Sequence, residues 1–257
     1  MADTVHIIMP MAGAGSRFKE QGYDVPKPLI KLNDVELYKH ALNSIDRNEQ
    51  LNGYDFKYTF IIREEFRDII VPQILESYPN AIILSVEETT KGALETVMIA
   101  EDYIKDDDYI IVMDCDLEFR SEDFIEDLNE AIDSNSPLLL SFYSRDPKYS
   151  YAAVNYGNNV TRVAEKELIS THALGGCYCL GTGKLFKKCA KMYIYDFYKG
   201  KINTPEIYVS LIYNYIINEL GDSVFLYDMN FHKDNYWSYG TPYDLEHYNY
   251  NRNIWDA

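Results

Sequence analysis

One segment near the N-terminus restricts the fold more than any other part of the chain. Residues 5–9 (Val-His-Ile-Ile-Met) form a short, mostly apolar run, and residues 11–18 (Met-Ala-Gly-Ala-Gly-Ser-Arg-Phe) follow it with small residues and an arginine. Such a run predicts a buried strand, and the small residues after it let backbone N–H groups come close to a ligand. The segment therefore predicts a sheet whose edge holds phosphate.

Strand-like and helix-like stretches alternate through the first half of the chain. Apolar runs typical of strands occupy residues 5–9, 58–62, 82–86, 109–113 and 138–143. Helical spacing of apolar residues covers 36–45, 65–78, 93–103 and 122–132, with Ser121 placed to cap the last of these helices. This alternation predicts an α/β fold: a Rossmann-like (GT-A-type), mixed and mostly parallel sheet flanked by helices.

The pattern changes after Asp146-Pro147. Residues 151–155 and 160–164 flank an Asn-rich turn and predict an inserted β-hairpin. A strand over 176–180, helices over 184–195 and 206–220 and a final strand over 224–227 follow, with Thr204 as cap and Pro205 in the first turn of the second helix. No linker separates these parts, so we expect a single domain over residues 1–257.

Charge and composition exclude several classes of partner. The formal net charge is −17, from 41 acidic and 24 basic residues, which argues against a nucleic acid or an anionic membrane. No apolar run reaches membrane-spanning length, and the four cysteines show no CxxC spacing, so we expect a cytoplasmic protein without a zinc site. A small phosphorylated ligand would then require local positive groups and a metal cation.

Two further motifs supply such groups. Pro26 and Pro28 restrict the backbone around Lys27, which predicts an ammonium presented from a stiffened loop. Asp114 and Asp116 follow the apolar run 109–113, and residues two apart point to the same side of an extended chain. Their carboxylates therefore predict a Mg²⁺ site at the end of that strand.

Residues 11–18 and 26–30 (Pro-Lys-Pro-Leu-Ile) resemble the signature of the sugar-1-phosphate nucleotidyltransferases, or nucleotide-sugar pyrophosphorylases. Related cytidylyltransferases act on other small phosphorylated metabolites. The third glycine of a dinucleotide-binding fingerprint is absent, which disfavours an oxidoreductase. The resemblance implies that Arg17 and Lys27 are catalytic and contact the triphosphate of a nucleotide. The residues that it assigns to nucleotide binding are Met11, Ala12, Gly13, Gly15, Ser16, Arg17, Glu87 and Gly92.

The resemblance extends into the second half of the chain. Residues 163–167 resemble a Glu-Lys-Pro element in which Glu165 would bind sugar hydroxyls and Lys166 the sugar phosphate, although Glu167 replaces the proline. Residues 236–242 resemble a Trp-Asp-x-Gly-Thr-Pro element, with Ser238 where a second metal-binding aspartate is common. The implied acceptor-binding residues are Glu165, Lys166, Gly176 and Trp237, and the implied metal ligands are Asp116, Asp114 and, in place of Ser238, Asp234.

The expected reaction transfers a nucleoside monophosphate from an NTP to the phosphate of a small phosphorylated metabolite, most commonly a sugar 1-phosphate, and releases pyrophosphate. Residues 1–145 would bind the nucleotide and residues 146–257 the acceptor, with self-association as is frequent in the family. The base is open between CTP, UTP and dTTP. The resemblance does not fix the acceptor either.

Three alternatives stay open. A CTP-dependent cytidylyltransferase would act on phosphocholine or a phosphorylated amino-acid derivative in surface or capsule polysaccharide synthesis. A metal-dependent glycosyltransferase would use the two aspartates but would have no need of the triphosphate loop. A nucleotide sensor without turnover is motivated by Ser238 and Glu167.

Overall fold

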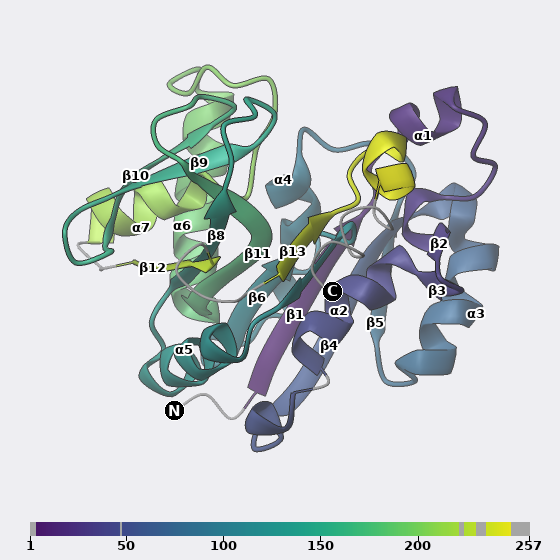
Figure 1. Cartoon of the computed structure of the whole chain (residues 1–257), viewed down its shortest axis with the longest axis horizontal. Coiled ribbons are helices and arrows are strands. Elements are labelled where there is room, and N and C mark those ends of the chain that lie inside the picture. The colour runs from purple at the N-terminus through teal and green to yellow at the C-terminus, as the bar shows by residue number, and fades with distance from the viewer. Residues whose placement is uncertain (1–3, 47, 221–223, 230–234, 248–257) are drawn as a thin grey trace.

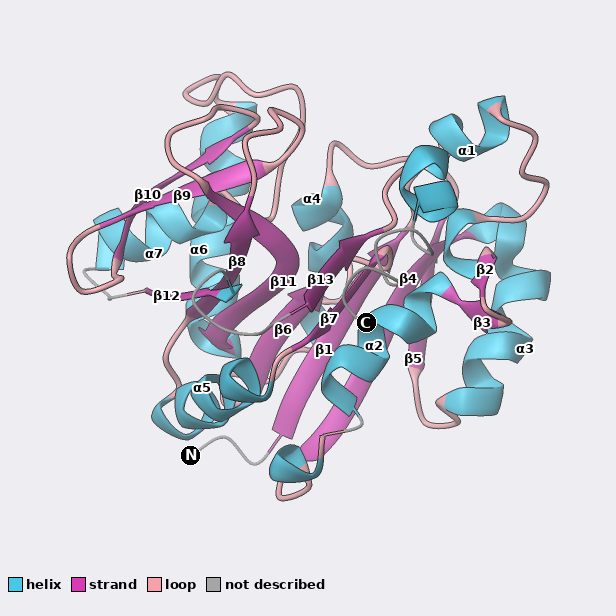
Figure 2. Cartoon of the chain, in the orientation of Figure 1, coloured by secondary structure: helices cyan, strands magenta, loops and turns pink. Residues whose placement is uncertain are grey.

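β1 (Thr4–Met11) runs through the middle of a nine-stranded sheet in the computed structural model, which describes residues 4–46, 48–220, 224–229 and 235–247. It pairs in parallel with β6 (Tyr109–Met113) on one side and with β4 (Asp55–Arg63) on the other, and β4 pairs in parallel with β5 (Ile82–Val86). The apolar strands β1, β4 and β6 suit central positions because helices cover both faces of the sheet, and β5 forms its edge (Figures 1 and 2).

β11 (His172–Thr182) adds an antiparallel region beside β6. It also pairs antiparallel with β8 (Leu138–Tyr143) and β9 (Ser150–Val154), and β12 (Phe225–Asp228) pairs in parallel with β8. β9 and β10 (Val160–Glu165) form the predicted hairpin. The α/β class with a mixed sheet flanked by helices is therefore confirmed.

Helices cover both faces of the sheet, and the alternation of β1 assigns its side chains to them. Val5, Ile7 and Met9 belong to one core cluster, whereas Ile8 belongs to the other. The first cluster contains residues of α2 (Leu37–Asp46), α3 (Arg67–Ser77) and α5 (Glu122–Ser134). The second contains residues of α4 (Ala93–Met98), α6 (Gly183–Tyr198) and α7 (Ile212–Leu220). The predicted cap is present, because the Ser121 hydroxyl accepts a hydrogen bond from the Phe124 N–H at 2.9 Å.

The predicted helix over residues 206–220 is wrong in its first part, because α7 begins only at Ile212. The Ile207 N–H donates to the Lys91 carbonyl at 2.8 Å, and the Ile207 carbonyl accepts from the Leu94 N–H at 3.1 Å. These bonds use the backbone groups that a helix would need, and they satisfy a free N–H in the first turn of α4. Thr204 is not a cap: its hydroxyl donates to the Glu206 carbonyl at 2.8 Å.

Four short strands, which form two pairs, were not predicted from the sequence. β7 (Leu117–Arg120) follows the predicted aspartates directly and pairs antiparallel with β13 (Asn235–Ser238), and Figure 2 labels the two strands near β1. β13 thus places the Trp-containing element next to the end of β6. A second small pair, β2 (Lys31–Leu32) and β3 (Val35–Glu36), leads into α2. The helix predicted over 93–103 is shorter, since α4 ends at Met98 and a 3₁₀ turn (Glu101–Tyr103) follows.

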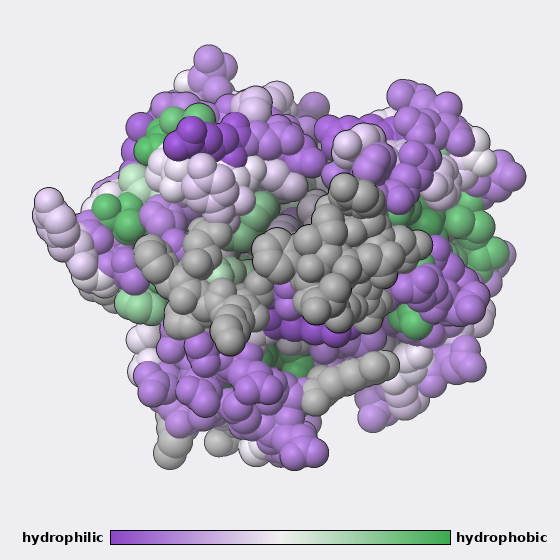
Figure 3. All heavy atoms as spheres, viewed as in Figure 1, coloured by the Kyte–Doolittle hydropathy of each residue, from purple (hydrophilic) through white to green (hydrophobic). Residues whose placement is uncertain are grey.

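The described surface is mainly polar on the face drawn in Figure 3, with apolar residues in small separate areas. Among the described residues, no helix combines the length and the apolar character needed to cross a bilayer.

His6 predicts how the stability of the fold depends on pH. Its side chain is fully buried on β1, where Nε2 lies 2.8 Å from the Thr59 hydroxyl. Burial, with a smaller contribution from Lys57, lowers the pKa of His6 from 6.5 to about 3. The unfolded chain therefore takes up a proton at His6 as the pH falls below 6.5, whereas the folded chain does not. The stabilisation that comes from a neutral His6 is therefore fully present above pH 6.5, and it is lost as the pH falls from there toward about 3.

We expect His6→Asn to be less stable than the wild type at neutral pH, with a difference that shrinks on acidification. The shrinkage should be about 1.4 kcal/mol for each pH unit between roughly pH 6 and pH 4. Urea unfolding at several pH values measures it. Thr59→Val serves as the control, because it removes the hydrogen bond and keeps the histidine and its pH dependence. A constant difference between wild type and His6→Asn would contradict this account.

Candidate active site

Two adjoining cavities lie at the carboxyl ends of β1 and β6. The loop cavity, of about 450 Å³, is lined by the glycine loop, Lys27 and the two aspartates. The hairpin cavity, of about 470 Å³, is lined by residues of β9, β10 and β11 and of the segments before α7 and after β13. Four residues line both cavities: Arg17, Asp114, Asp116 and Gly240. We call this shared wall the junction.

The glycine loop reaches the loop cavity through one unusual backbone conformation. Gly15 has φ 61° and ψ 24° and precedes the short helix α1 (Ser16–Glu20). Its carbonyl accepts hydrogen bonds from the N–H groups of Phe18 and Lys19, each at 3.1 Å. A left-handed residue at this point favours glycine and turns the chain so that Arg17 faces the junction. Met11, Gly13 and Ser16 line the same cavity.

Lys27 also lines the loop cavity, with its Cβ 3.8 Å from where a Cβ of Gly15 would be. Lys27 lies between Pro26 and Pro28 and begins a 3₁₀ turn (Lys27–Leu29). Its ammonium forms an ion pair with the Asp116 carboxylate. Burial disfavours the charge on Lys27, but Asp116 and its neighbours outweigh that effect, so the pKa of Lys27 lies above its ordinary value. Lys27 is thus a fixed positive charge at the junction.

The space for the Asp114 carboxylate exists because the neighbouring strand, β11, has a glycine beside it. Its N–H donates to the Gly176 carbonyl at 2.9 Å, and Gly176 has φ 71°. A Cβ atom on Gly176 would lie 2.8 Å from Asp114 Oδ2, so only glycine leaves room for the carboxylate. Burial and the charge of Asp116 raise the pKa of Asp114. A cation beside this carboxylate would relieve both effects.

These two carboxylates fit the chemistry of a magnesium site. They supply the hard oxygen ligands that Mg²⁺ prefers, and both are part of the junction, the wall that the two cavities share. Within the described ranges, no group of three or more acidic, histidine or cysteine side chains forms a complete metal site. Asp234, the third predicted ligand, lies outside the described residues. Substrate phosphates and water would therefore complete the coordination of an ion at Asp114 and Asp116.

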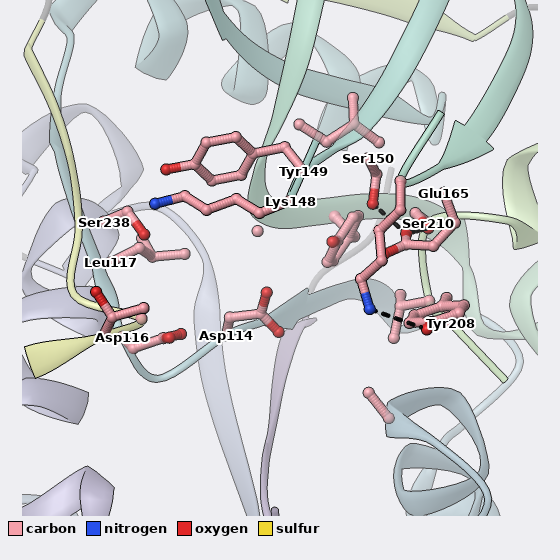
Figure 4. Close-up of a pocket in the computed structure, with 18 of the residues that line it drawn as sticks. Asp114, Asp116, Leu117, Lys148, Tyr149, Ser150, Glu165, Tyr208, Ser210 and Ser238 are labelled. Atoms are coloured by element: carbon pink, nitrogen blue, oxygen red, sulfur yellow. Dashed lines mark hydrogen bonds between the residues drawn. The ribbon is translucent and has the colours of Figure 1, made fainter. Parts of the chain in front are cut away.

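Hydroxyl groups surround Glu165, an acidic residue of the hairpin cavity (Figure 4). Glu165 accepts hydrogen bonds from the Ser150 hydroxyl and, at 2.9 Å, from the Ser210 hydroxyl. Burial raises the pKa of Glu165, although these hydrogen bonds oppose the shift. Lys166, with φ 53°, turns its ammonium to the Tyr208 hydroxyl at 3.1 Å. The arrangement offers a carboxylate and a cation to one polar ligand.

A buried network holds the backbone of Asp116 in place. The Tyr239 N–H donates to the Asp116 carbonyl at 2.6 Å, and the Tyr239 hydroxyl donates to Glu118 at 2.8 Å. His40 lies 2.9 Å from Glu118 through Nδ1 and 2.9 Å from the Leu32 carbonyl through Nε2. The Leu32 carbonyl can only accept, so Nε2 donates to it, while Nδ1 faces the Glu118 carboxylate. α2, β7 and β13 are thereby tied together behind the junction.

Some predicted residues lie away from both cavities. Ala12 is buried, Glu87 is exposed, and neither lines a cavity. Gly92 has φ 151°, and a Cβ there would lie 2.5 Å from the Ile207 backbone, so this glycine permits close packing while its neighbour Ala93 lines the hairpin cavity. Trp237 stacks with the guanidinium of Arg120 at 5.6 Å instead of lining either cavity.

Several lining residues were missed by the sequence analysis. Tyr236 and Ser238, the neighbours of Trp237, line the hairpin cavity because side chains alternate along β13. Lys148, Tyr208 and Ser210 line it from segments whose sequence shows no motif. The change of pattern after Asp146-Pro147 was the one signal available for Lys148. Tyr208 and Ser210 were concealed within the helix wrongly predicted over 206–220.

Comparison with known proteins places this geometry in a family. The profile described as nucleotidyl transferase matches residues 5–214. No curated protein shows a significant match.

Similar solved structures include a nucleoside-diphosphate-sugar pyrophosphorylase from Vibrio cholerae RC9, with 21% identity, 93% of this chain and 98% of that chain covered and a TM-score of 0.70. An inositol-1-phosphate CTP transferase from T. maritima has 18% identity, covers 99% and 94% of the two chains and has a TM-score of 0.72. A UTP-bound UGPase from Acinetobacter baumannii has 15% identity, 95% and 91% coverage and a TM-score of 0.68. At these identities the structures show a shared fold.

Gly176→Ala tests the close approach of β11 to Asp114. We expect this variant to unfold more easily than Gly200→Ala by about 1–2 kcal/mol, because its methyl group would overlap the carboxylate. Gly200 is a matched control: its φ is also 71°, but a Cβ there would meet no atom within 4 Å. Both variants thus carry the same backbone strain, and urea unfolding isolates the contact. Equal stabilities would show that Asp114 and its surroundings adjust to the methyl group.

Proposed function

The chain belongs to the nucleotidyl transferase family, and from this membership we propose that it transfers a nucleoside monophosphate from an NTP to the phosphate of a small metabolite, most commonly a sugar 1-phosphate. The observation that carries the proposal is the junction: Arg17, Asp114 and Asp116 line both cavities. Two substrates held in separate cavities would meet there. The loop cavity would hold the NTP and the hairpin cavity the acceptor.

Residue types on each side support this assignment. The loop cavity combines backbone of the glycine loop with the cations Arg17 and Lys27, which suits a triphosphate. The hairpin cavity combines Glu165, serine hydroxyls and Lys166, which suits a ligand that carries both hydroxyl groups and a phosphate. We accordingly propose that residues 1–145 bind the nucleotide and residues 146–257 the acceptor.

In the proposed reaction, an oxygen of the acceptor phosphate forms a bond to the α-phosphorus of the NTP. The bond from the α-phosphorus to the oxygen that bridges it to the β-phosphorus breaks, and pyrophosphate leaves with that electron pair. Both reactants are anions, so Lys27 and Arg17 would offset their repulsion and stabilise charge on the leaving group. Mg²⁺ held by Asp114 and Asp116 would neutralise phosphate charge.

The relatives support phosphorylated acceptors and pyrimidine nucleotides. One is a nucleoside-diphosphate-sugar pyrophosphorylase, one is an inositol-1-phosphate CTP transferase, and one structure holds UTP. A glycosyltransferase would not require the Lys27 side of the site, because a nucleotide sugar has no triphosphate. The family match therefore favours nucleotidyl transfer over that alternative.

A matrix of pyrophosphate release tests the proposal. CTP, UTP, dTTP, ATP and GTP are each combined with sugar 1-phosphates, phosphocholine and phosphorylated amino-acid derivatives in the presence of Mg²⁺. We expect release above background with one NTP and a sugar 1-phosphate, and mass spectrometry should detect the matching nucleotide-linked product. The Asp116→Asn variant serves as the control for contaminating activity. A folded wild-type protein that binds NTPs but releases no pyrophosphate with any pair would refute the proposal and favour a sensor.

Lys27→Ala should lower turnover far more than stability. Removal of a preorganised charge next to the reacting phosphates is expected to cost roughly 100-fold or more in kcat. The melting temperature should stay close to that of the wild type. Lys31→Ala is the matched control, because Lys31 lies four residues along the chain with its side chain 57% exposed and outside both cavities. Near-normal turnover of folded Lys27→Ala would remove Lys27 from the catalytic residues.

A further inference from the structure

Lys148 is a cation of the hairpin cavity that none of the sequence motifs includes. It lies between β8 and β9, where its N–H donates to the Asp146 side chain at 3.0 Å and the Tyr149 N–H donates to the Asp146 carbonyl at 3.2 Å. This turn fixes the backbone from which the side chain extends. In Figure 4 the Lys148 side chain runs beside Tyr149, and its ammonium points toward Ser238 on β13.

The ion pairs of Lys148 are long. Its ammonium lies 3.4 Å from Asp244 and 3.7 Å from Asp146, whereas charge-assisted N–H···O bonds are typically about 2.7–2.9 Å. Lys201, a surface lysine of the same chain, reaches that range with Asp196 at 2.7 Å. Asp244 is also engaged elsewhere, because it accepts a hydrogen bond from the Thr241 hydroxyl at 2.7 Å. Lys148 therefore donates one long hydrogen bond, to Asp244, and makes no short one with either carboxylate.

Gly240 connects this ammonium to the junction. A Cβ at Gly240 would lie 3.2 Å from Asp116 Oδ2, 3.6 Å from Ser238 Oγ and 4.0 Å from Asp244 Oδ2. The space that the missing side chain leaves is thus bordered by an oxygen of Asp116 and by oxygens of two near neighbours in sequence, Ser238 and Asp244. Asp244 is the residue that Lys148 approaches, so the ammonium stands at the edge of the shared wall. Lys27 pairs with Asp116 from the loop cavity, and Lys148 approaches from the hairpin cavity.

We propose that Lys148 is a further catalytic residue, whose ammonium contacts the acceptor phosphate at the junction, opposite Lys27. The proposal rests on the proposed nucleotidyl transfer. Its ligand chemistry is a phosphate oxyanion, and the weak pairing with Asp244 keeps the ammonium in position until that oxyanion arrives. Lys148 adds positive charge on the side of the site where Ser238 supplies only a neutral hydroxyl.

Electrostatics agree with a charged lysine at this position. The groups that face Lys148 are the carboxylates Asp146 and Asp244 and the Tyr149 hydroxyl. Burial disfavours its charge, but Tyr149 and Asp244 outweigh that effect and keep the pKa of Lys148 above its ordinary value. The acceptor phosphate would approach a wall that already carries the two aspartates. A cation on the acceptor side offsets that repulsion.

Steady-state kinetics of Lys148→Gln with the best substrate pair test the proposal. We expect kcat/KM for the acceptor to fall about 10- to 100-fold, as for the loss of a hydrogen bond to a charged group. The KM for the NTP should change little, and Lys148→Arg should retain more activity than Lys148→Gln because it keeps the charge. Lys201→Gln is the matched control, since Lys201 also pairs with an aspartate but lies on the surface. Wild-type kinetics in Lys148→Gln would overturn the proposal.

A titration with inorganic phosphate separates this proposal from the proposed function. It compares Lys27→Ala with the double variant Lys27→Ala/Lys148→Gln, so that the phosphate site of the loop cavity is weakened in both. Phosphate binding about tenfold weaker in the double variant would support a phosphate contact of Lys148, even if no substrate pair releases pyrophosphate. Equal affinities in the two variants would overturn it.

Discussion

The ion pair between Lys27 and Asp116 is the interaction on which the organisation of the site depends. It joins the proline-flanked turn after the glycine loop to the segment that follows β6, across 89 positions of sequence. The side chains of Lys27 and Asp116 remain 24% and 20% exposed, so the pair lies at the wall of the loop cavity, where solvent still reaches it. A substrate phosphate or a metal ion that enters the loop cavity must compete with this contact. The resting site is therefore neutralised internally, and its charges are ready to be redistributed over bound anions.

Two different features of the structure hold the aspartates of the site in place. On one side, Gly176 removes a side chain so that β11 can approach the Asp114 carboxylate. On the other side, the imidazole of His40 binds Glu118 and the Leu32 carbonyl, while Tyr239 binds both Glu118 and the Asp116 backbone. The glycine supplies space, and the network supplies hydrogen bonds. Together they fix the positions of the two aspartates.

The sequence predicted those parts of the fold that local pattern determines. β5, β6 and β8 have the predicted bounds because apolar runs of five or six residues that are bounded by polar residues are too short for a typical helix and favour strands. Residues 206–211 were assigned to a helix because their own preferences allow one, but hydrogen bonds between Ile207 and the residues around Gly92 prevent it. The same difference between local pattern and tertiary contact applies to the residues of the site. Lys27 and Asp116 belong to motifs, whereas Lys148 and Ser210 acquire their places only through tertiary contacts.

The net charge of the chain determines which groups in the site must attract anions. A protein with a net charge of −17 repels anionic substrates at long range, and salt screens that field within about 10 Å at 0.1 M ionic strength. Capture of phosphates therefore depends on cations at short range. Arg17, Lys27 and Lys166 come from three separate segments and line cavities that meet at two aspartates. Because these cations come from separate segments, the proposed phosphate site would form only when the sheet has brought the glycine loop and the hairpin together. Binding of two anions, as proposed, would thus depend on the packing of β11 against β6.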